Sequence, residues 1–498
     1  MSLSLFLLCW TPVVLLSVLA VFFQRSALEL AIYGLLYVAV LASLAFQTPL
    51  SVILLAAADG FVTTAPLLAV VFLGILFSQL LVATGSLKRL VAWLLSGLDR
   101  SLPRHLLITL GLGNFFEGAS IIAEPMVAPM LHTTGVRPAG AAALSIIGYS
   151  GLMSVEMAGI IITVLALVTG LPFYDLGVAA AWLSIPATLL MGLCIPFFLP
   201  DPGEGWRRLP LILGCALLVS GAALAAAVWL GVAISGMVGG LVLVGVLLWR
   251  GERPPARDSR ILIDLAPFAV ILVPLLLVNT VPWLQELTMR RLSFTISLIP
   301  IHAITFTPLF SAYLYLFLAL LLAFRLLQVT PEQRRLLWLV GVAKGWRALV
   351  AMGLFGAMGQ VIAYSGYEVG FGRLDQAHNI PWVLAAGLKL YTGSLYPLFV
   401  PLLGWVGTFL TGYGVASLML FGELQVQAAA LLGVSATMLA AGLTVGASIG
   451  SISSPFKIAI ATPMCGAVGQ EGWILRLTIP LGILASLVMG VVLWVVSG

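Results

Sequence analysis

Long apolar runs recur from one end of the chain to the other, and they restrict the fold more than any other feature of the sequence. About 20 consecutive apolar residues cross the hydrocarbon core of a bilayer as a helix. Only 8% of the residues are charged, whereas soluble domains contain about 25%. Shorter and broken runs between the long ones bring the expected number of crossings to about 12 to 14. We therefore predict an all-α polytopic membrane protein, with long runs at residues 5–23, 28–46, 64–84, 176–199, 210–230, 232–249, 265–281, 309–328, 348–364, 396–410 and 475–496.

The first of these runs meets no charge before Arg25. A cleaved signal peptide has a basic start, a shorter apolar core and a small-residue cleavage site, so we expect this run to remain as a membrane span. Four cysteines lie in apolar runs without the spacing of a metal or disulfide site. They are expected to be packing residues: Cys9, Cys194, Cys215 and Cys465.

The net charge of +5 is concentrated in loops between the apolar runs. Cytoplasmic loops of membrane proteins carry an excess of Lys and Arg, so we place these loops in the cytoplasm and the chain in the plasma (inner) membrane of a bacterium. Nucleic-acid binding is not expected, because it needs a basic face on an aqueous domain. The basic residues form three groups: Lys88, Arg89, Arg100 and Arg104; Arg250, Arg253, Arg257 and Arg260; Arg325, Arg334, Arg335, Lys344 and Arg347.

The most polar segment, RGERPPARDSR, lies almost at mid-chain. Many transporters are built from two repeats with the substrate site between them. We predict a first membrane repeat over residues 1–249, a cytoplasmic linker over 250–264 and a second membrane repeat over 265–498. A shared spacing supports this division: Glu124 is followed by Gly135-Val136, Ala141 to Ala143 and Gly148-Tyr149-Ser150, and Glu423 by Gly433-Val434, Ala440-Ala441 and Gly446-Ala447-Ser448.

Glycines and prolines interrupt both halves at corresponding places. Proline removes a helix donor and clashes with the preceding turn, and unpaired backbone groups are tolerated at membrane depth only where protein buries them or water reaches them. We predict a re-entrant hairpin and a broken helix over about 111–165 and again over about 404–470, with kinked continuous helices as the alternative. The breaks at Pro125 and Pro455 are expected to meet near the membrane midplane. The interruptions are Gly118, Pro125, Pro129, Gly135 and Pro138, then Gly412, Gly414, Gly446, Gly450, Pro455 and Pro463.

Five charged residues fall inside the interrupted regions: Glu117, Glu124, Glu156, Glu423 and Lys457. A charge at membrane depth is costly and usually faces a cavity or a partner. We interpret Lys457 as the attractor of a substrate anion and the glutamates as carriers of a coupling proton, because desolvation disfavours the charged form of a carboxyl. The alternative is a purely structural pair between Lys457 and Glu124 or Glu156.

Several polar and aromatic side chains near these charges are candidates for substrate binding. A hydroxyl can donate a hydrogen bond to a carboxylate or to another hydroxyl. The same residue types also serve as small packing residues between membrane helices, which is the alternative for each serine and threonine. With Lys457, the candidates are Ser454, Ser453, Ser448, Thr411, Ser150, Tyr413 and Phe456.

The sequence does not favour an enzyme. The stretch from Gly446 to Gly450 fits G-x-S-x-G, but it lacks the strand–turn–helix context of a nucleophile. The motif H-E-x-x-H is absent, and His132 is expected to be an interfacial histidine. No cofactor and no metal site are expected.

Three stretches resemble the L-lactate permease family. GNFFEGASIIAEP, which ends at Pro125, resembles the family's E-G-x-x-G-F-G-x-P stretch. GWVGTFLTGYGVASLMLFGELQ, which starts at Gly404, resembles its second-half hairpin, and GSISSPFKIAIATPMCGAVGQEG, which starts at Gly450, resembles its I-S-P-Q-S-I-A-x-A segment and the following G-L-V-G-K-E. The similarity is dense over about 105–165 and 404–490. The matching positions are Glu117, Gly118, Pro125, Thr411, Gly412, Phe421, Gln425, Ser454 and Pro455.

This resemblance implies a secondary active transporter, a proton-coupled symporter of short 2-hydroxymonocarboxylates such as lactate or glycolate. It also implies the elevator-like, inverted-repeat fold of the ion-transporter superfamily, in which a homodimer combines scaffold domains with moving transport domains. The chain departs from the family pattern at Glu124, at Glu156 within the segment IGYSGLMSVEMAG, and at Phe456 followed by Lys457. These departures favour a divergent member that carries another small organic anion.

Two other functions remain open from the sequence. The excess of glutamates over Lys457 also suits coupling to sodium or a cationic substrate, since a hard cation prefers oxygen ligands. A membrane scaffold without transport activity is the third possibility. Uptake measured with a proton gradient, a sodium gradient or neither separates the first two.

Overall fold

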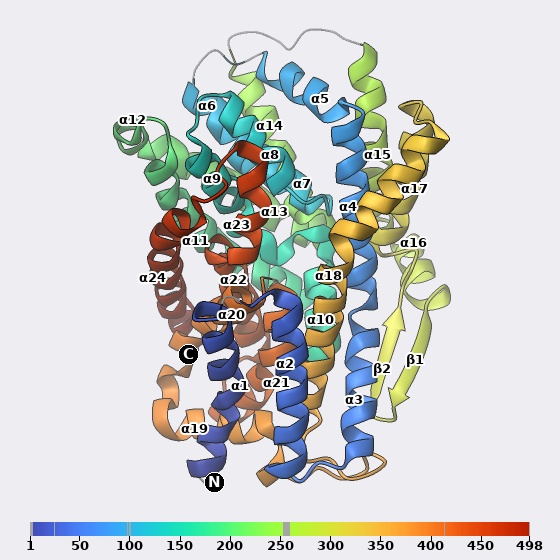
Figure 1. The fold of residues 1–498 in the computed structure, drawn as a ribbon, viewed down its shortest axis with the longest axis vertical. Helices are drawn as coiled ribbons and strands as arrows, with labels where there is room; N and C mark the ends of the chain where they lie inside the picture. Colours follow the sequence, from blue (N-terminus) through green and yellow to red (C-terminus); the bar gives the residue numbers. More distant parts are fainter. Residues whose placement is uncertain are drawn as a thin grey trace.

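The computed structural model describes residues 3–23, 25–96, 98, 101–251, 259–412 and 414–497. Figure 1 shows an elongated helical bundle in which most long helices run close to the long axis. Eleven described helices are long and apolar enough to cross a membrane, and four shorter apolar helices accompany them. The prediction of a helical polytopic membrane protein is therefore confirmed. The eleven candidate spans are Ala27–Leu44, Ala65–Ala83, Phe173–Phe198, Leu209–Trp229, Val232–Trp249, Arg260–Thr280, Gly345–Ala363, Ile380–Thr411, Gly414–Leu432, Ala436–Ser453 and Glu471–Ser497.

Five helices open the chain: α1 (Leu3–Val21), α2 (Ala27–Leu44), α3 (Leu50–Thr63), α4 (Ala65–Ala83) and α5 (Ser86–Leu95). Helices α2, α3 and α4 pack against the long helix α18 (Pro331–Ala363). A Cβ atom on Gly60 would lie 2.2 Å from the carbonyl oxygen of Gly356. Glycine is therefore needed where α3 and α18 touch, since small residues let membrane helices approach closely.

The first hairpin comprises residues 101–133. Its first arm consists of α6 (Ser101–Leu106), the π-helical turn η1 (Leu107–Leu112) and α7 (Gly113–Gly118), and its second arm is α8 (Glu124–Thr133). A broken helix follows, in which the turns η2 (Met153–Val155) and η3 (Met157–Gly159) separate α9 (Pro138–Ser150) from α10 (Ile160–Thr169). The hairpin begins at Ser101, about ten residues before the predicted start near 111.

The second hairpin joins α20 (Val400–Thr411) to α21 (Gly414–Leu432). Gly412 at its tip has a φ of 82°, a conformation that favours glycine. A second broken helix follows, with η9 (Ser451–Ser453) between α22 (Ala436–Gly450) and α23 (Pro455–Cys465). A Cβ atom on Gly446 would lie 2.0 Å from the oxygen of Pro401, so α20 and α22 are in close contact. Helix α24 (Glu471–Ser497) follows.

The remaining helices lie between these units. They are α11 (Phe173–Cys194), η4 (Ile195–Phe198), α12 (Pro202–Arg207), α13 (Leu209–Trp229), η5 (Val232–Ile234), α14 (Ser235–Trp249), α15 (Ser259–Thr280), α16 (Pro282–Glu286), η6 (Leu287–Arg291), α17 (Ala312–Leu326), η7 (Gln376–His378), α19 (Ile380–Thr392) and η8 (Gly393–Phe399). Since α15 begins at Ser259, the last residues of the predicted linker are helical. Arg89 on α5 binds Asp264 on α15 through both carboxylate oxygens, at 2.8 and 2.6 Å.

Two antiparallel strands add a β-hairpin to the all-α prediction. Strands β1 (Phe294–Ile299) and β2 (His302–Phe306) pair Phe294 with Phe306 and Ile296 with Ile304. Both strands are rich in β-branched and aromatic residues, which favour a pleated surface. The hairpin lies beside α3, as Figure 1 shows.

Most of the described residues in the three basic groups lie on elements at one end of the bundle. Lys344 and Arg347 do not lie in a loop as predicted, because both are inside α18, and Arg347 falls within the candidate span Gly345–Ala363. In Figure 1, α5, the start of α15 and the junction of α17 with α18 are all at the upper end. This agrees with the cytoplasmic location that the positive charge predicts. Arg100, Arg253 and Arg257 lie outside the described residues. Helices α6 and α8 of the first hairpin lie in the upper half of the figure, and α20 and α21 of the second lie in the lower half.

Candidate substrate and coupling site

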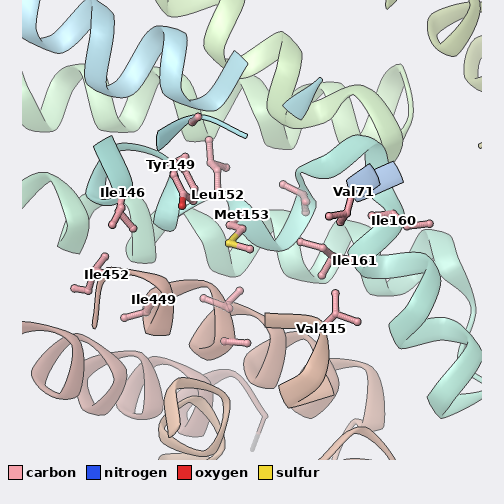
Figure 2. Close-up of a cluster of buried hydrophobic side chains, with 14 of the residues drawn as sticks. Val71, Ile146, Tyr149, Leu152, Met153, Ile160, Ile161, Val415, Ile449 and Ile452 are labelled. Atoms are coloured by element: carbon pink, nitrogen blue, oxygen red, sulfur yellow. The ribbon is translucent and has the colours of Figure 1, made fainter. Parts of the chain in front are cut away.

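The two broken helices meet in the interior of the bundle. Half-helix α23 packs against α8 and α9, while α10 packs against α21. The break at η9 contacts α9, and η2 contacts α22. Figure 2 shows Tyr149, Leu152 and Met153 from the first break facing Ile449 and Ile452 from the second. Pro125 lies at the start of α8 and Pro455 at the start of α23, and these two helices pack against each other.

A lysine, a tyrosine and a glutamate form the centre of this junction. Lys457 Nζ donates a hydrogen bond to the Tyr149 hydroxyl at 2.8 Å, and that hydroxyl donates to Glu124 Oε1 at 2.5 Å. The ammonium lies 3.9 Å from Glu124 Oε1 and 4.7 Å from the centre of the Tyr149 ring. All three side chains are buried. We name this arrangement the Lys457–Tyr149–Glu124 triad.

The positions of the triad residues follow from local helix geometry. Lys457 is in the first turn of α23, where Ser454 caps the helix by accepting a hydrogen bond from the Lys457 N–H at 3.4 Å. Glu124 is the first residue of α8, so its carboxylate lies at the positive end of a helix dipole. Tyr149 is near the end of α9. Three different half-helices thus deliver the triad.

Glu117 lies at the tip of the first hairpin. Its Oε1 accepts a hydrogen bond from the Ala123 N–H at 2.9 Å and so connects the end of α7 to the start of α8. The turn between α7 and α8 leaves backbone donors that no helix satisfies. Glu117 therefore has a structural task in addition to any exchange of protons.

Glu156 lies in the first break and is fully buried. Neither of its carboxylate oxygens has a hydrogen-bond partner among the described residues, and Glu124 Oε2 is in the same condition. Buried polar atoms are nearly always paired. Unpaired carboxylate oxygens beside the triad therefore indicate a site that is completed by protons or by a ligand.

Most of the predicted hydroxyl donors bind to the protein itself. Ser150, Ser448 and Thr411 each donate to the carbonyl four residues earlier in their own helix, at 2.7, 2.9 and 2.8 Å. Ser453 donates to the Thr478 carbonyl at 2.8 Å. These bonds would have to be exchanged before the hydroxyls could hold a substrate.

The other predicted site residues lie at the edge of the junction or apart from it. Phe456 lies against the hairpin tip, where a Cβ atom on Gly412 would approach the phenylalanine Cβ to 2.7 Å. Tyr413 lies outside the described residues. Glu423 on α21 accepts a hydrogen bond from Gln427 at 2.8 Å. It lies close enough to Tyr364 and Tyr367 to interact with both electrostatically.

The structure also brings residues to the site that the sequence did not single out. Tyr149 is the clearest, and the signal was a bulky polar residue in a half-helix of small residues. Met153 accepts hydrogen bonds from Lys457 Nζ at 3.4 Å and from Ser451 at 3.0 Å through its sulfur. Asn114 ties the first hairpin to α9 by donating to the Gly148 carbonyl at 3.0 Å.

The charge balance of the junction favours a bound cation or proton. Glu117, Glu124 and Glu156 carry three negative charges when ionised, against the single positive charge of Lys457. Two uncompensated charges in a buried site are costly. Within the described part of the chain, no cluster of three or more His, Cys, Asp and Glu could hold a metal ion. Protons on two of the three glutamates would bring the net charge of the junction to zero.

Comparison with solved structures finds transporters that differ widely in sequence. The Alcanivorax borkumensis YdaH transporter aligns with 95% of this chain and 98% of its own, at a TM-score of 0.49 and 13% identity. Neisseria gonorrhoeae MtrF aligns with 94% of each chain, at a TM-score of 0.45 and 15% identity.

Sequence comparison identifies relatives over most of the chain. The glycolate permease GlcA of Escherichia coli (strain K12) is 25% identical over 512 residues, covering 91% of this chain and 88% of its own. An L-lactate permease of Streptococcus iniae is 26% identical, covering 73% and 78%. The L-lactate permease of Escherichia coli (strain K12) is 35% identical, but only over 28% of this chain and 26% of its own.

These relatives are bacterial permeases, which agrees with the prediction of a transporter and not of an enzyme. With its apolar helices, the chain is a multi-pass protein of the bacterial inner membrane. The family model for L-lactate permease matches residues 5–249 and 257–497. The resemblance of the three quoted stretches is thereby confirmed, and the chain belongs to the L-lactate permease family.

Proposed function

We propose that this protein is a secondary active transporter that moves a small organic anion together with protons. The expected substrates are 2-hydroxymonocarboxylates, such as the lactate and glycolate for which its relatives are named, or a closely related acid. The observation that supports this proposal is the buried Lys457–Tyr149–Glu124 triad at the junction of the broken helices.

The triad has the chemistry that a hydroxy acid requires. Lys457 offers an ammonium to the substrate carboxylate, and the Tyr149 hydroxyl can donate to the substrate hydroxyl or carboxylate. The N–H groups at the start of α23 add partial positive charge. Aliphatic side chains, Ile146, Leu152 and Ile452, lie near Tyr149 in Figure 2. A small anion with a short apolar end would fit these surroundings.

Proton binding and anion binding are linked in this arrangement. Glu124 competes with the substrate carboxylate for Lys457 and Tyr149, because it already occupies both. A proton on Glu124 removes the competing charge and releases the two groups for the substrate. Proton and anion would then be carried together. Glu117 and Glu156 are further proton acceptors in the same junction.

We propose with this function that residues 1–249 and 265–498 form two inverted repeats joined by the segment 250–264. Each half holds a hairpin followed by a broken helix, and the two hairpins lie in opposite halves of Figure 1. A homodimer with elevator-like movement is proposed from the family resemblance.

Uptake by purified protein in proteoliposomes tests the proposal. Radiolabelled lactate and glycolate should accumulate under an inward proton gradient and not under an inward sodium gradient or without a gradient. Accumulation driven by sodium alone would show that the transporter is coupled to sodium, with the glutamates as sodium ligands instead of proton carriers. Absence of uptake, together with absence of ligand-dependent thermal stabilisation by hydroxy acids, keto acids, sulfonates and dicarboxylates, would support a scaffold protein instead.

A further inference from the structure

A second buried ionisable pair lies away from the triad. Asp59 on α3 is fully buried, and its Oδ2 lies 2.7 Å from Nδ1 of His302, whose side chain is 13% exposed. His302 is the first residue of β2. Its other ring nitrogen, Nε2, lies 3.2 Å from the carbonyl oxygen of Leu167 on α10. The imidazole therefore connects α3 to the second half of the first broken helix.

The partners of the imidazole determine how many protons the pair holds. A carbonyl oxygen can only accept a hydrogen bond, so Nε2 must carry a proton to bind Leu167. The contact with Asp59 also needs a proton, placed on either Nδ1 or the carboxyl. The pair thus holds two protons in this conformation, either as imidazolium and carboxylate or as neutral imidazole and carboxylic acid.

Loss of one proton would break one of these contacts. A carboxylate is a stronger acceptor than a peptide carbonyl, so the remaining N–H would stay with Asp59. The bare Nε2 would then face the Leu167 oxygen with a lone pair, which is repulsive. The proton leaves to water, and no bond other than N–H or O–H changes.

We propose that Asp59 and His302 form a second proton-binding site, and that its loaded state holds the end of α10 against α3. Helix α10 starts directly after Gly159, close in sequence to Glu156 of the proposed transport site. If the end of α10 near Leu167 were released, the break that carries Glu156 would become looser. This proposal concerns different residues from the proposed transport site and does not depend on the identity of the substrate.

The surroundings contain further titratable groups on other elements. The ring of Tyr364, at the end of α18, lies 6.2 Å from that of His302. Tyr364 interacts electrostatically with both Asp59 and Glu423 on α21, and Tyr367 interacts with Glu423. The tyrosines are neutral in the pH range of interest. Asp59 Oδ1 has no hydrogen-bond partner in the described part of the chain, so it has room for a second proton donor.

Hydrogen–deuterium exchange of the full-length protein in nanodiscs tests this proposal. Peptides covering Ile160–Thr169 are followed at pH 6, 7.5 and 9, and rates are corrected for intrinsic exchange. We expect α10 to exchange about tenfold faster at the highest pH, since a hydrogen bond to a charged group shifts an opening equilibrium by about that factor. Asp59→Asn and His302→Gln should remove this pH dependence, because neither leaves a carboxyl–imidazole pair to titrate.

The exposed pair of His378 and Asp375 provides a matched control, with the same 2.7 Å contact between Nδ1 and Oδ2. His378 lowers the pKa of the Asp375 carboxyl through this hydrogen bond. A lowered carboxyl pKa is a contribution to stability that is lost only as the pH falls through it, below the range tested. His378→Gln should therefore behave like the wild type. Exchange in α10 that is independent of pH, or that keeps its pH dependence in both Asp59→Asn and His302→Gln, would overturn the proposal.

Discussion

Replacing Lys457 with alanine should abolish most of the substrate affinity while the protein remains folded. Two unit charges about 4 Å apart, the separation of Lys457 Nζ and Glu124 Oε1, attract by about 4 kcal/mol at an effective dielectric near 20. Desolvation offsets much of this attraction, and a hydrogen bond to a charged group contributes about 1.5–3 kcal/mol net. A substrate carboxylate that takes the place of Glu124 should therefore bind about 10- to 150-fold more weakly without the ammonium. Ligand-dependent thermal stabilisation of the purified variant measures this loss.

Two variants separate anion binding from a structural pairing of Lys457. Lys457→Met keeps most of the side-chain volume and should lose affinity to the same extent as the alanine variant. Lys457→Ala combined with Glu124→Gln should not regain substrate binding, because the anion has lost its ammonium. Lys389→Met is the control. Lys389 lies on α19, outside the junction, and donates a hydrogen bond to the backbone carbonyl of Leu431 on α21. Recovery of binding in the double variant would refute the reasoning and make Lys457 a structural partner of Glu124.

Three further changes probe coupling and stability. Glu117→Gln should reduce proton-driven accumulation in proteoliposomes far more than substrate exchange, because the amide keeps an acceptor for the hairpin tip but cannot titrate; equal effects on both would remove Glu117 from coupling. Arg89→Ala leaves Asp264 buried without its ion pair and should cost about 1–3 kcal/mol of stability, measured by thermal unfolding. Adding Asp264→Asn should recover part of this loss. An unchanged Tm in Arg89→Ala would show that the pair contributes nothing. Gly446→Ala places a Cβ atom 2.0 Å from a backbone oxygen of α20 and should lower the free energy of unfolding by about 1–3 kcal/mol. Gly214→Ala is the control and should leave stability unchanged, because there is open space around Gly214. Equal stability of the two variants would contradict the close packing of α20 and α22.

The sequence predicted those parts of the fold that depend on local composition. Apolar runs of membrane length became helices because the bilayer leaves few alternatives. Pro125 and Pro455 lie in the first turns of α8 and α23, where proline is favoured. Pro129 and Pro463, which were also predicted to be interruptions, lie inside these same helices. The β-hairpin escaped prediction because its strands are short and lie between apolar runs that suggested only helices.

The composition of the site was harder to predict because its contacts join distant parts of the chain. Tyr149 and Lys457 are 308 positions apart, and Asp59 and His302 are 243 apart. No local pattern announces such pairs. The hydroxyl of Ser150 shows a second limit, since a serine in a membrane helix can bind its own helix carbonyl as well as a ligand. Glu423 was assigned to the coupling group because it is a charge inside an interrupted segment, and in the structure it accepts a hydrogen bond from Gln427 on the same helix.

Substrate-driven proton movement tests the central claim most directly. Purified protein is reconstituted into liposomes that contain a pH-sensitive dye, and lactate or glycolate is added outside without an imposed proton or sodium gradient. Coupled entry of proton and anion predicts rapid acidification of the lumen with the wild type, and only the slow signal of protein-free liposomes with Lys457→Met. Entry of labelled substrate with no acidification beyond that background would contradict proton symport through the Lys457–Tyr149–Glu124 triad.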